Sequence, residues 1–379
     1  MKTNHVIEAA LQSAVEDGVF PGAVLAVRLR GELRCLIAAG RLASRESEVP
    51  AQVSTVYDLA SLTKPLATTT SILLLVQEGR LGLHDQACNV LTELAGSAIG
   101  EARIQDLLSH SSGLPGWRPL YEKLADEGAV ASSPDQARRT KERVINLIRD
   151  EALIYAKGEK SLYSDLGFML LGFMVERISG ATLDQFAGET CFQPLGAQPL
   201  TFCPIAIGRP ADRSSQAIER TRIAPTEFDP WRNRQLQGEV HDENAAALGG
   251  VAGHAGLFGT AEAVLAVSGA WLAAYHHRPS ILATPLVRRF VTRESHVPNS
   301  SWALGWDTPS MPSSSGSCLS PKAFGHLGYT GTSLWIDPSC ELEVVLLSNR
   351  VYPTRKNEKI REFRPLIHDL VYREYVAGR

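Results

Sequence analysis

The chain has 379 residues, of which 44% are hydrophobic and 21% are charged. This composition is typical of a globular protein with one large core or two modest ones, and it excludes a disordered, collagen-like or mucin-like chain. The formal net charge of -3 provides no basic surplus to neutralise phosphates, so we expect neither nucleic acid nor an anionic membrane as a partner.

The first eighteen residues contain a polar or acidic side chain every few positions, which predicts a helix of the mature protein and not a signal peptide. Apolar runs such as residues 168–175 are far shorter than the roughly 20 residues that span a bilayer, so no membrane segment is predicted. The cysteines lie singly, without C-x-x-C spacing, and we interpret them as free thiols of a cytoplasmic protein. They are Cys35, Cys88, Cys191, Cys203, Cys318 and Cys340.

Two strands are predicted near the N-terminus, at residues 22–30 and 32–39, joined by a turn at Gly31. Helical periodicity then dominates as far as residue 275. Strands return later in the chain and are followed by an amphipathic helix. The later strands are predicted at residues 302–306, 328–337 and 342–349 and the last helix at 358–376; the central helices are predicted at 63–77, 103–108, 134–151, 167–178, 183–189 and 260–275.

Strands at both chain ends around a helical middle predict an α+β fold. Its antiparallel sheet would be built from both chain ends, flanked by terminal helices, with a large, mainly helical region inserted. We expect residues 1–58 and 296–379 to form the sheet region and residues 59–295 the helical region, with the active site in the cleft between them. Residues 198–248 lack periodicity, and a connection of that length is often a wall or lid of a site.

A candidate nucleophile, Ser61, lies where a strand-like run ends and a helix begins, because Pro65 fits only in the first turn of a helix. Lys64 follows three residues later and therefore shares a face with Ser61. A lysine amine that burial keeps partly neutral can take the serine proton, and a helix N-terminus favours an oxyanion nearby. The alternative is that Ser61 caps the helix and Lys64 is a surface lysine.

Two later segments carry further candidates. Tyr163 lies in a loop that leads into a helix, from which a side chain can reach a site, although it could equally be a core aromatic residue beside a capping Ser164 or Asp165. Residues 324–337 alternate like a strand and contain three glycines, which leave an edge open to a ligand. His326 in this segment could instead be a purely structural histidine.

The three segments together have the order S-x-x-K, a Tyr-led triplet and H-x-G. In this they resemble the serine β-lactamase and penicillin-binding protein superfamily, specifically its class C-like branch of class C β-lactamases, D-aminopeptidases and family VIII esterases. Residues 106–115, DLLSHSSGLP, look like the DLLTHTSGLP signature of that branch, and residues 250–261, GVAGHAGLFGTA, extend the similarity. The resemblance covers nearly the whole chain and implies a β-lactamase/transpeptidase-like fold.

The resemblance also implies roles for individual residues. Ser61 would attack the substrate carbonyl, Lys64 and Tyr163 would share the acid and base work, and His326 would stand where the family has Lys or His. Positive charge on Lys64 and on a protonated His326 would lower the pKa of Tyr163. The oxyanion hole would consist of the backbone N–H groups of Ser61 and Tyr329, and the substrate-binding residues would be Asp165, Gly328, Thr330 and Gly331.

Two positions depart from the family pattern. Asp165 replaces the usual Asn, and His326 in place of Lys provides a cation for only part of the time at neutral pH. Both changes weaken recognition of a substrate carboxylate, so penicillins are not the expected substrates.

We therefore expect a serine hydrolase that works through an acyl-enzyme on small esters or amides, with esterase, D-amino-acid peptidase or weak β-lactamase activity and no cofactor. The alternative is a non-catalytic binder of peptidoglycan fragments or peptides in the same cleft. No metal is expected, because His241, Asp242 and His254 lack the spacing of a zinc motif and are interpreted as loop hydrogen-bonding residues.

Overall fold

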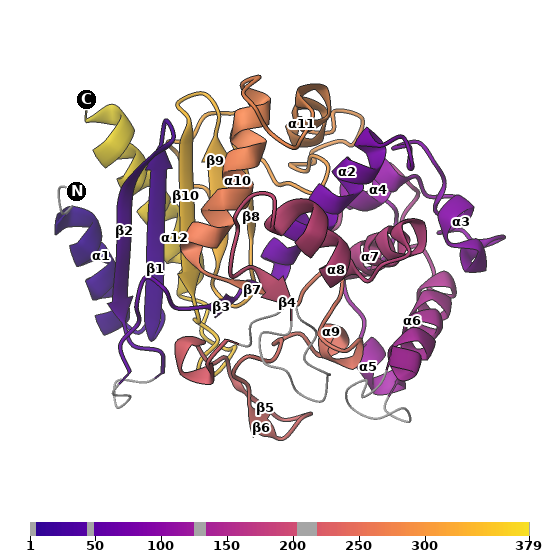
Figure 1. Ribbon diagram of the computed structural model, residues 1–379, viewed down its shortest axis with the longest axis horizontal. Helices are drawn as coiled ribbons and strands as arrows, with labels where there is room; N and C mark the ends of the chain where they lie inside the picture. Colours follow the sequence, from indigo (N-terminus) through magenta and orange to yellow (C-terminus); the bar gives the residue numbers. More distant parts are fainter. Residues whose placement is uncertain (1–4, 44–48, 125–133, 203–217, 379) are drawn as a thin grey trace.

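The computed structural model describes residues 5–43, 49–124, 134–202 and 218–378. A five-stranded antiparallel sheet forms one side of the molecule, and most of the helices form the other (Figure 1). The strand order is β2-β1-β10-β9-β8. The strands are β1 (Gly22–Leu29), β2 (Glu32–Gly40), β8 (Phe324–Leu327), β9 (Ser333–Asp337) and β10 (Leu342–Ser348).

The sheet joins the two ends of the chain, because β1 pairs with β10 from Ala23 opposite Ser348 to Leu29 opposite Leu342. Successive side chains of a strand face opposite sides of the sheet. Val24 and Ala26 accordingly belong to the large core shared with the helical region, whereas Leu25 belongs to the smaller core on the other face. A strand buried on both faces explains the nearly continuous apolar sequence of β1, and the predicted α+β arrangement is confirmed.

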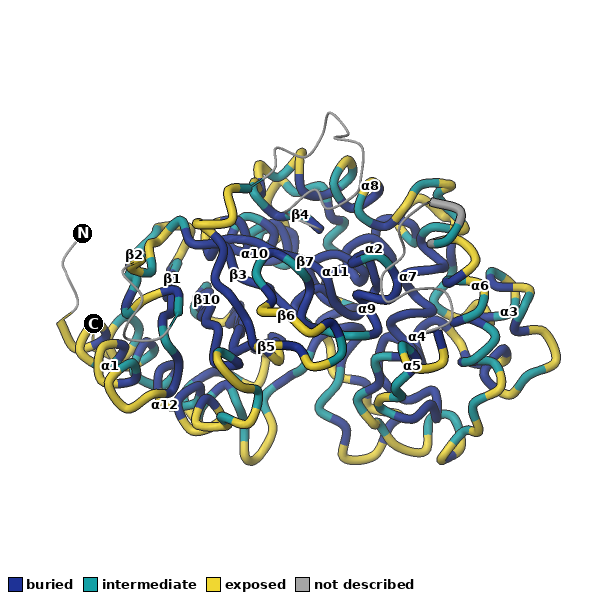
Figure 2. The backbone as a smooth tube through the Cα atoms, turned by 90° about the horizontal axis from the view of Figure 1, so that it is seen from below, coloured by how far each residue is buried: buried dark blue, intermediate teal, exposed yellow. Residues whose placement is uncertain are grey.

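Helices cover both faces of the sheet. The terminal helices α1 (His5–Glu16) and α12 (Ile360–Tyr372) pack together on the outer face, and α10 (Ala261–Tyr275) packs on β1 and β10 from the inner side (Figure 1). Figure 2 shows that strands β1 and β10 of the sheet and helices α2 and α7 of the helical region all consist mostly of buried residues. The sheet and the helical region therefore share one continuous core.

The helical region is organised around α7, which buries every residue from Leu166 to Val175. Ser164 caps its start and the left-handed Gly180 ends it. The other helices of this region are α2 (Thr70–Gln77), α3 (Ala87–Val90), α4 (Ile104–Leu108), α5 (Leu120–Lys123), α6 (Pro134–Arg149), α8 (Leu183–Ala187), α9 (Glu243–Ala247) and α11 (Thr284–Val291). Short strands are β3 (Tyr57–Asp58), β4 (Thr201–Phe202), β5 (Phe228–Asp229), β6 (Arg234–Gln235) and β7 (Leu257–Gly259).

Three predicted elements differ from the structure. The strand predicted at 328–337 is a turn followed by β9, because Gly331 adopts a left-handed φ of 117° and the Gly328 N–H bonds the Thr332 carbonyl. The strand predicted at 302–306 is reduced to an isolated bridge between Trp302 and Asp307. The helix predicted at 63–77 begins as a π-helical turn over Lys64–Thr69 before α2.

Among the described residues, no single helix has the length and apolarity needed to cross a membrane. Two consecutive helices, Asp165–Ser179 and Leu183–Phe192, have the required length and apolarity only when they are taken together, and the chain bends by 76° between them. Most of the first of these helices is buried inside the protein.

Candidate active site

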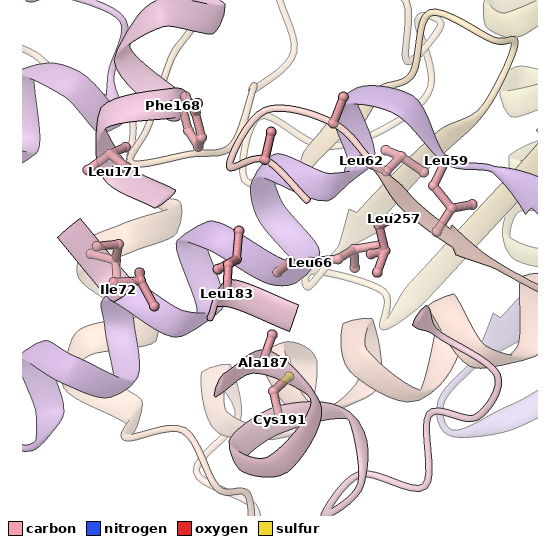
Figure 3. Packing of buried hydrophobic residues seen from close by; sticks show 14 of the residues in the cluster. Leu59, Leu62, Leu66, Ile72, Phe168, Leu171, Leu183, Ala187, Cys191 and Leu257 are labelled. Carbon is pink, nitrogen blue, oxygen red and sulfur yellow. The ribbon is translucent and has the colours of Figure 1, made fainter. Parts of the chain in front are cut away.

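Ser61 lies on a short 3₁₀ turn, Ala60–Leu62, directly after β3. Ala60 has a left-handed φ of 47°, an uncommon conformation for a residue with a side chain, and the Asp58 carboxylate accepts its N–H at 2.8 Å. The chain therefore bends sharply just before the serine. Figure 3 shows Leu66 between Leu183 and Leu257, and Leu62 beside Leu59. The segment that bears Ser61 is therefore held by the core on its inner side.

Lys64 is fully buried and lies between the other polar groups of the site. Its Nζ is 2.9 Å from Ser61 Oγ, 2.7 Å from Asp165 Oδ1 and 3.0 Å from the His254 carbonyl oxygen. The surface-lysine alternative is therefore wrong. Burial by itself lowers the pKa of Lys64, but the negative charge of Asp165 and the interaction with Tyr163 outweigh burial, and the net pKa is raised. The resting side chain is an ammonium, contrary to the partly neutral amine expected from burial alone.

Tyr163 approaches the same ammonium from the loop before α7. Lys64 Nζ lies 4.8 Å from the centroid of the Tyr163 ring, and the phenol also interacts with Ser61. Burial raises the pKa of Tyr163 to about 12, although Lys64 and Ser61 pull it downward. The expectation of a lowered pKa is wrong because burial of the phenol outweighs the charge of Lys64, which the charge of Asp165 also offsets. Tyr163 is a neutral phenol at physiological pH.

His326 lies on β8 with its ring centroid 5.9 Å from that of Tyr163. Its Nδ1 is 2.7 Å from the Leu327 carbonyl oxygen, so Nδ1 carries the proton and donates it. Nε2 is buried and has no partner among the described protein atoms. Burial, reinforced by the charge of Lys64, lowers the pKa of His326 to about 3. His326 is therefore neutral at pH 7 and not the part-time cation predicted from the sequence.

The turn after β8 is fastened to the residues that precede Ser61. Thr330 Oγ1 donates to the Asp58 carbonyl at 2.7 Å, and Thr332 Oγ1 donates to the Leu59 carbonyl at 3.0 Å. A Cβ at Gly328 would lie 2.5 Å from the Leu59 oxygen, so only glycine allows this close approach. The two segments predicted to supply the oxyanion hole are thus joined by hydrogen bonds.

The other residues predicted to contact the substrate differ in their exposure to solvent. Tyr329 is half exposed, whereas Thr330 and Gly331 are buried. The Thr330 hydroxyl is already used inside the protein, and Gly331 packs against Ser348, so their role in the structure is to hold the turn. Asp165 is mostly buried and pairs with Lys64.

One residue of the site was not assigned a role from the sequence. His110, within the DLLSHSSGLP motif, lies against the Tyr163 ring at a centroid distance of 4.7 Å, and its Nδ1 accepts the Ser164 N–H at 3.0 Å. Its carbonyl accepts the N–H of Leu162 at 2.9 Å. His110 therefore supports the loop that carries Tyr163 through one ring contact and two hydrogen bonds to the loop backbone. The motif itself was the available signal, because a polar side chain in an otherwise buried run needs a partner.

The GVAGHAGLFGTA segment has a comparable supporting function. It supplies the His254 carbonyl to Lys64, and Gly253 lies so close to α7 that a Cβ on Gly172 would be 2.8 Å from the Gly253 Cα. The His254 ring bonds Asp242 at 2.8 Å, as loop hydrogen bonding predicts. In the described part of the chain, no three His, Cys, Asp or Glu side chains are grouped to hold a metal ion.

Two surface cavities, of about 500 Å³ and 530 Å³, lie elsewhere and include none of these side chains. One is lined around His276 and Arg288 and the other around Phe20 and Tyr352.

Comparisons with known proteins identify the family of this chain. The sequence model of the Beta-lactamase family matches residues 7–368. A provisionally named D-alanyl-D-alanine carboxypeptidase of Escherichia coli K12 is 34% identical over 318 residues, which cover 80% of this chain and 71% of that protein. A Salmonella typhimurium protein with the same provisional name is 31% identical over 325 residues, covering 82% and 73% of the two chains.

Solved structures show the same fold. The hydrolase EstCE1, described as having promiscuous acyltransferase activity, has a TM-score of 0.69 at 20% identity, with 95% of this chain and 97% of that chain covered. The octameric penicillin-binding protein homologue of Pyrococcus abyssi has a TM-score of 0.70 at 19% identity, covering 100% and 82%. The resemblance drawn from the sequence motifs is confirmed: this chain belongs to the Beta-lactamase family.

Proposed function

We propose that this chain is a serine hydrolase that acylates Ser61 with small ester or amide substrates. The observation that carries the proposal is the position of Lys64 Nζ, 2.9 Å from Ser61 Oγ in a fully buried environment. A serine hydroxyl becomes a useful nucleophile only when a neighbouring group accepts its proton. Burial of an ammonium beside a hydroxyl has no evident benefit for stability, because a charge is costly to remove from water.

The proton route follows from the two short contacts of Lys64. As Ser61 Oγ forms a bond to the substrate carbonyl carbon, Lys64 accepts the serine proton and passes one of its own protons to Asp165, 2.7 Å away. Lys64 remains an ammonium throughout this relay, in agreement with its raised pKa. The neutral Tyr163 phenol then donates a proton to the leaving group, and the proton on Asp165 returns through Lys64. Water later reverses these transfers to release the acyl group.

The carbonyl oxygen must be stabilised as negative charge develops on it. We assign this role to the backbone N–H groups of Ser61 and Tyr329, supported by the bonds from Thr330 and Thr332 that fasten the two segments together. Ser61, Lys64 and Tyr163 come from the predicted helical region, 59–295, and His326 and Tyr329 from the sheet region. Substrate would then bind at the boundary of the two regions.

The charge of the site favours an acyl donor without a carboxylate beside the nucleophile. Asp165 is anionic and His326 is neutral, so neither attracts the carboxylate of a penicillin. Esters and D-amino-acid amides are the preferred substrates on this ground. A D-alanyl-D-alanine carboxypeptidase is the second candidate, because the relatives at 31–34% identity carry that provisional name.

The decisive experiment is to incubate the protein separately with a fluorophosphonate and with a labelled penicillin and to locate the added mass by peptide mass spectrometry. An adduct on Ser61 that is absent from Ser61→Ala supports the proposal. Saturable ligand binding by folded protein without any adduct would favour the non-catalytic binder instead. Rates with p-nitrophenyl esters, nitrocefin and D-alanyl-D-alanine peptides then rank the substrate classes.

We also propose a cytoplasmic location. The five described cysteines, at positions 35, 88, 191, 318 and 340, are all free thiols, and free thiols persist in a reducing compartment. Cys203 lies outside the described residues. Fractionation of the native host, with detection by antibody, tests this location.

A further inference from the structure

A buried arginine lies behind the turn that carries the Tyr329 N–H. Arg364, on helix α12, is 6% exposed, and its Nη2 donates to the carbonyl oxygens of Gly328 at 2.6 Å and Thr332 at 2.7 Å. These two residues begin and end the turn between β8 and β9. A guanidinium is costly to bury, so its use on two backbone carbonyls at this one turn needs an explanation.

The geometry of the peptide group connects Arg364 to the candidate oxyanion hole. The Gly328 carbonyl and the Tyr329 N–H belong to one planar, trans peptide unit, in which C=O and N–H point in opposite directions. When Arg364 fixes the Gly328 oxygen on the α12 side, it also fixes the Tyr329 N–H toward the opposite side.

The charge of Arg364 adds a second effect. Hydrogen bonds from an ionised donor are stronger than those between neutral groups, and a hydrogen bond to a peptide oxygen polarises the peptide so that its N–H becomes a better donor. The guanidinium thereby places positive charge behind the N–H that would face a developing oxyanion.

The next peptide of the turn is held in a similar way. Arg350 Nε donates to the Tyr329 carbonyl at 2.8 Å, and its Nη1 is fixed by the carbonyls of Arg355 and Asn357 at 2.9 Å and 2.6 Å. Arg350 thus restrains the Tyr329–Thr330 peptide, whereas Arg364 restrains the peptide that contains the N–H in question. The Gly328 oxygen, opposite the Tyr329 N–H, also accepts the Gly331 N–H at 3.2 Å, so Arg364 is its shorter and its charged donor in the described hydrogen bonds.

We infer that Arg364 is a positioning residue of the oxyanion hole, which orients and polarises the Tyr329 N–H through the Gly328 carbonyl. This inference rests on the proposed acylation of Ser61. It extends the functional site to the C-terminal helix, on the side of the turn away from the nucleophile.

The test compares Arg364→Met, which removes the hydrogen bonds and charge, with Arg364→Lys, which keeps the charge. The matched control is Arg361→Met, which removes an exposed arginine of the same helix that pairs with Glu358. Each folded variant is acylated with a p-nitrophenyl ester labelled with ¹³C at its carbonyl. The readouts are kcat, KM and the infrared stretching frequency of the acyl-enzyme carbonyl.

Loss of one oxyanion-hole donor typically lowers turnover about 10²- to 10³-fold, and misorientation of a donor that is still present should cost less. We expect Arg364→Met to lower kcat roughly 10- to 100-fold with little change in KM, and to move the carbonyl band to higher wavenumber because the carbonyl is less polarised. Arg364→Lys should recover part of both effects. Arg361→Met should match the wild-type protein.

A folded Arg364→Met with wild-type kcat and an unmoved band would overturn the inference while leaving the proposed function intact. If Arg364→Met does not fold, an unmoved band in Arg364→Lys has the same consequence, because the ammonium cannot reproduce the guanidinium geometry. An equal loss in Arg361→Met would also overturn it, since only net charge would then matter. Failure of the wild-type protein to acylate Ser61 would instead reject the proposed function on which the inference rests.

Discussion

Asp165 Oδ1 lies 2.7 Å from Lys64 Nζ, so the carboxylate and not the serine makes the shorter contact with the buried ammonium. The family pattern has Asn at this position, which can accept a hydrogen bond but cannot take up a proton at neutral pH. In the proposed mechanism, this carboxylate therefore gives Lys64 a proton acceptor that an Asn could not provide.

The first prediction concerns this carboxylate. Asp165→Asn should lower turnover of a p-nitrophenyl ester at pH 7 by at least about 10-fold, because the relay loses its proton acceptor. The pKa of Lys64 should fall once the negative charge is removed, so the residual activity should rise with pH as the neutral amine becomes available. The pH dependence of kcat/KM measures both effects.

Asp150→Asn is the control, since Asp150 is an exposed carboxylate paired with Arg149. Wild-type turnover of Asp165→Asn at pH 7 would contradict the relay and leave Lys64 as a direct base. The same variant also tests substrate charge, because loss of the anion should improve acylation by nitrocefin relative to the ester.

The second prediction concerns Tyr163. With a pKa of about 12, the phenol stays protonated throughout the range in which most proteins remain folded, so turnover should show no alkaline decline below about pH 10. Tyr163→Phe keeps the ring that packs on His110 but removes the donor, and should lower turnover about 10²-fold. A wild-type decline near pH 9 that disappears in Tyr163→Phe would show that the phenol titrates in the normal range.

Lys64 and Tyr163 also show how much of the site can be predicted from the sequence. The position of Lys64 beside Ser61 follows from a three-residue spacing on one helical turn, which is local geometry, and the structure has that contact. The protonation states of Lys64 and Tyr163 were predicted incorrectly, because they depend on charges that only the folded chain brings together. The strands at both chain ends predict one sheet built from both, but the pairing of β1 with β10 within it is seen only in the structure. The turn inside residues 328–337 depends on contacts with Leu59 and α12 that no local pattern contains.

The third prediction concerns His110, which accepts the Ser164 N–H and has a left-handed φ of 56°. His110→Ala should lower the free energy of unfolding by about 2 kcal/mol, because a buried N–H loses its acceptor and a cavity forms beside Tyr163. Turnover should fall about 10-fold through a less ordered tyrosine, with the acidic limb of the pH profile unmoved.

His110→Asn is the matched comparison, because Asn tolerates the left-handed conformation and its side-chain oxygen can replace Nδ1 as the acceptor. Chemical denaturation and steady-state kinetics should place this variant between His110→Ala and the wild-type protein. Equal losses in the two variants would show that the ring, and not the hydrogen bond, supports the loop.

The last prediction concerns acid stability. Burial lowers the pKa of His326 to about 3 and that of His368 to about 4, against about 6.5 in an unfolded chain. Below pH 6.5 the unfolded chain therefore binds protons that the native protein does not, and the free energy of unfolding falls as the pH decreases toward the native pKa values. Each histidine should cost about 2 kcal/mol between pH 7 and pH 5, at about 1.4 kcal/mol per pH unit below 6.5. Urea denaturation at the two pH values measures the loss. The variant His368→Gln retains a hydrogen-bond partner for the Ser314 carbonyl. Its free energy of unfolding should fall by about 2 kcal/mol less between pH 7 and pH 5 than that of the wild-type protein, because one titrating histidine is removed. An unchanged fall would mean that His368 is already protonated in the native protein.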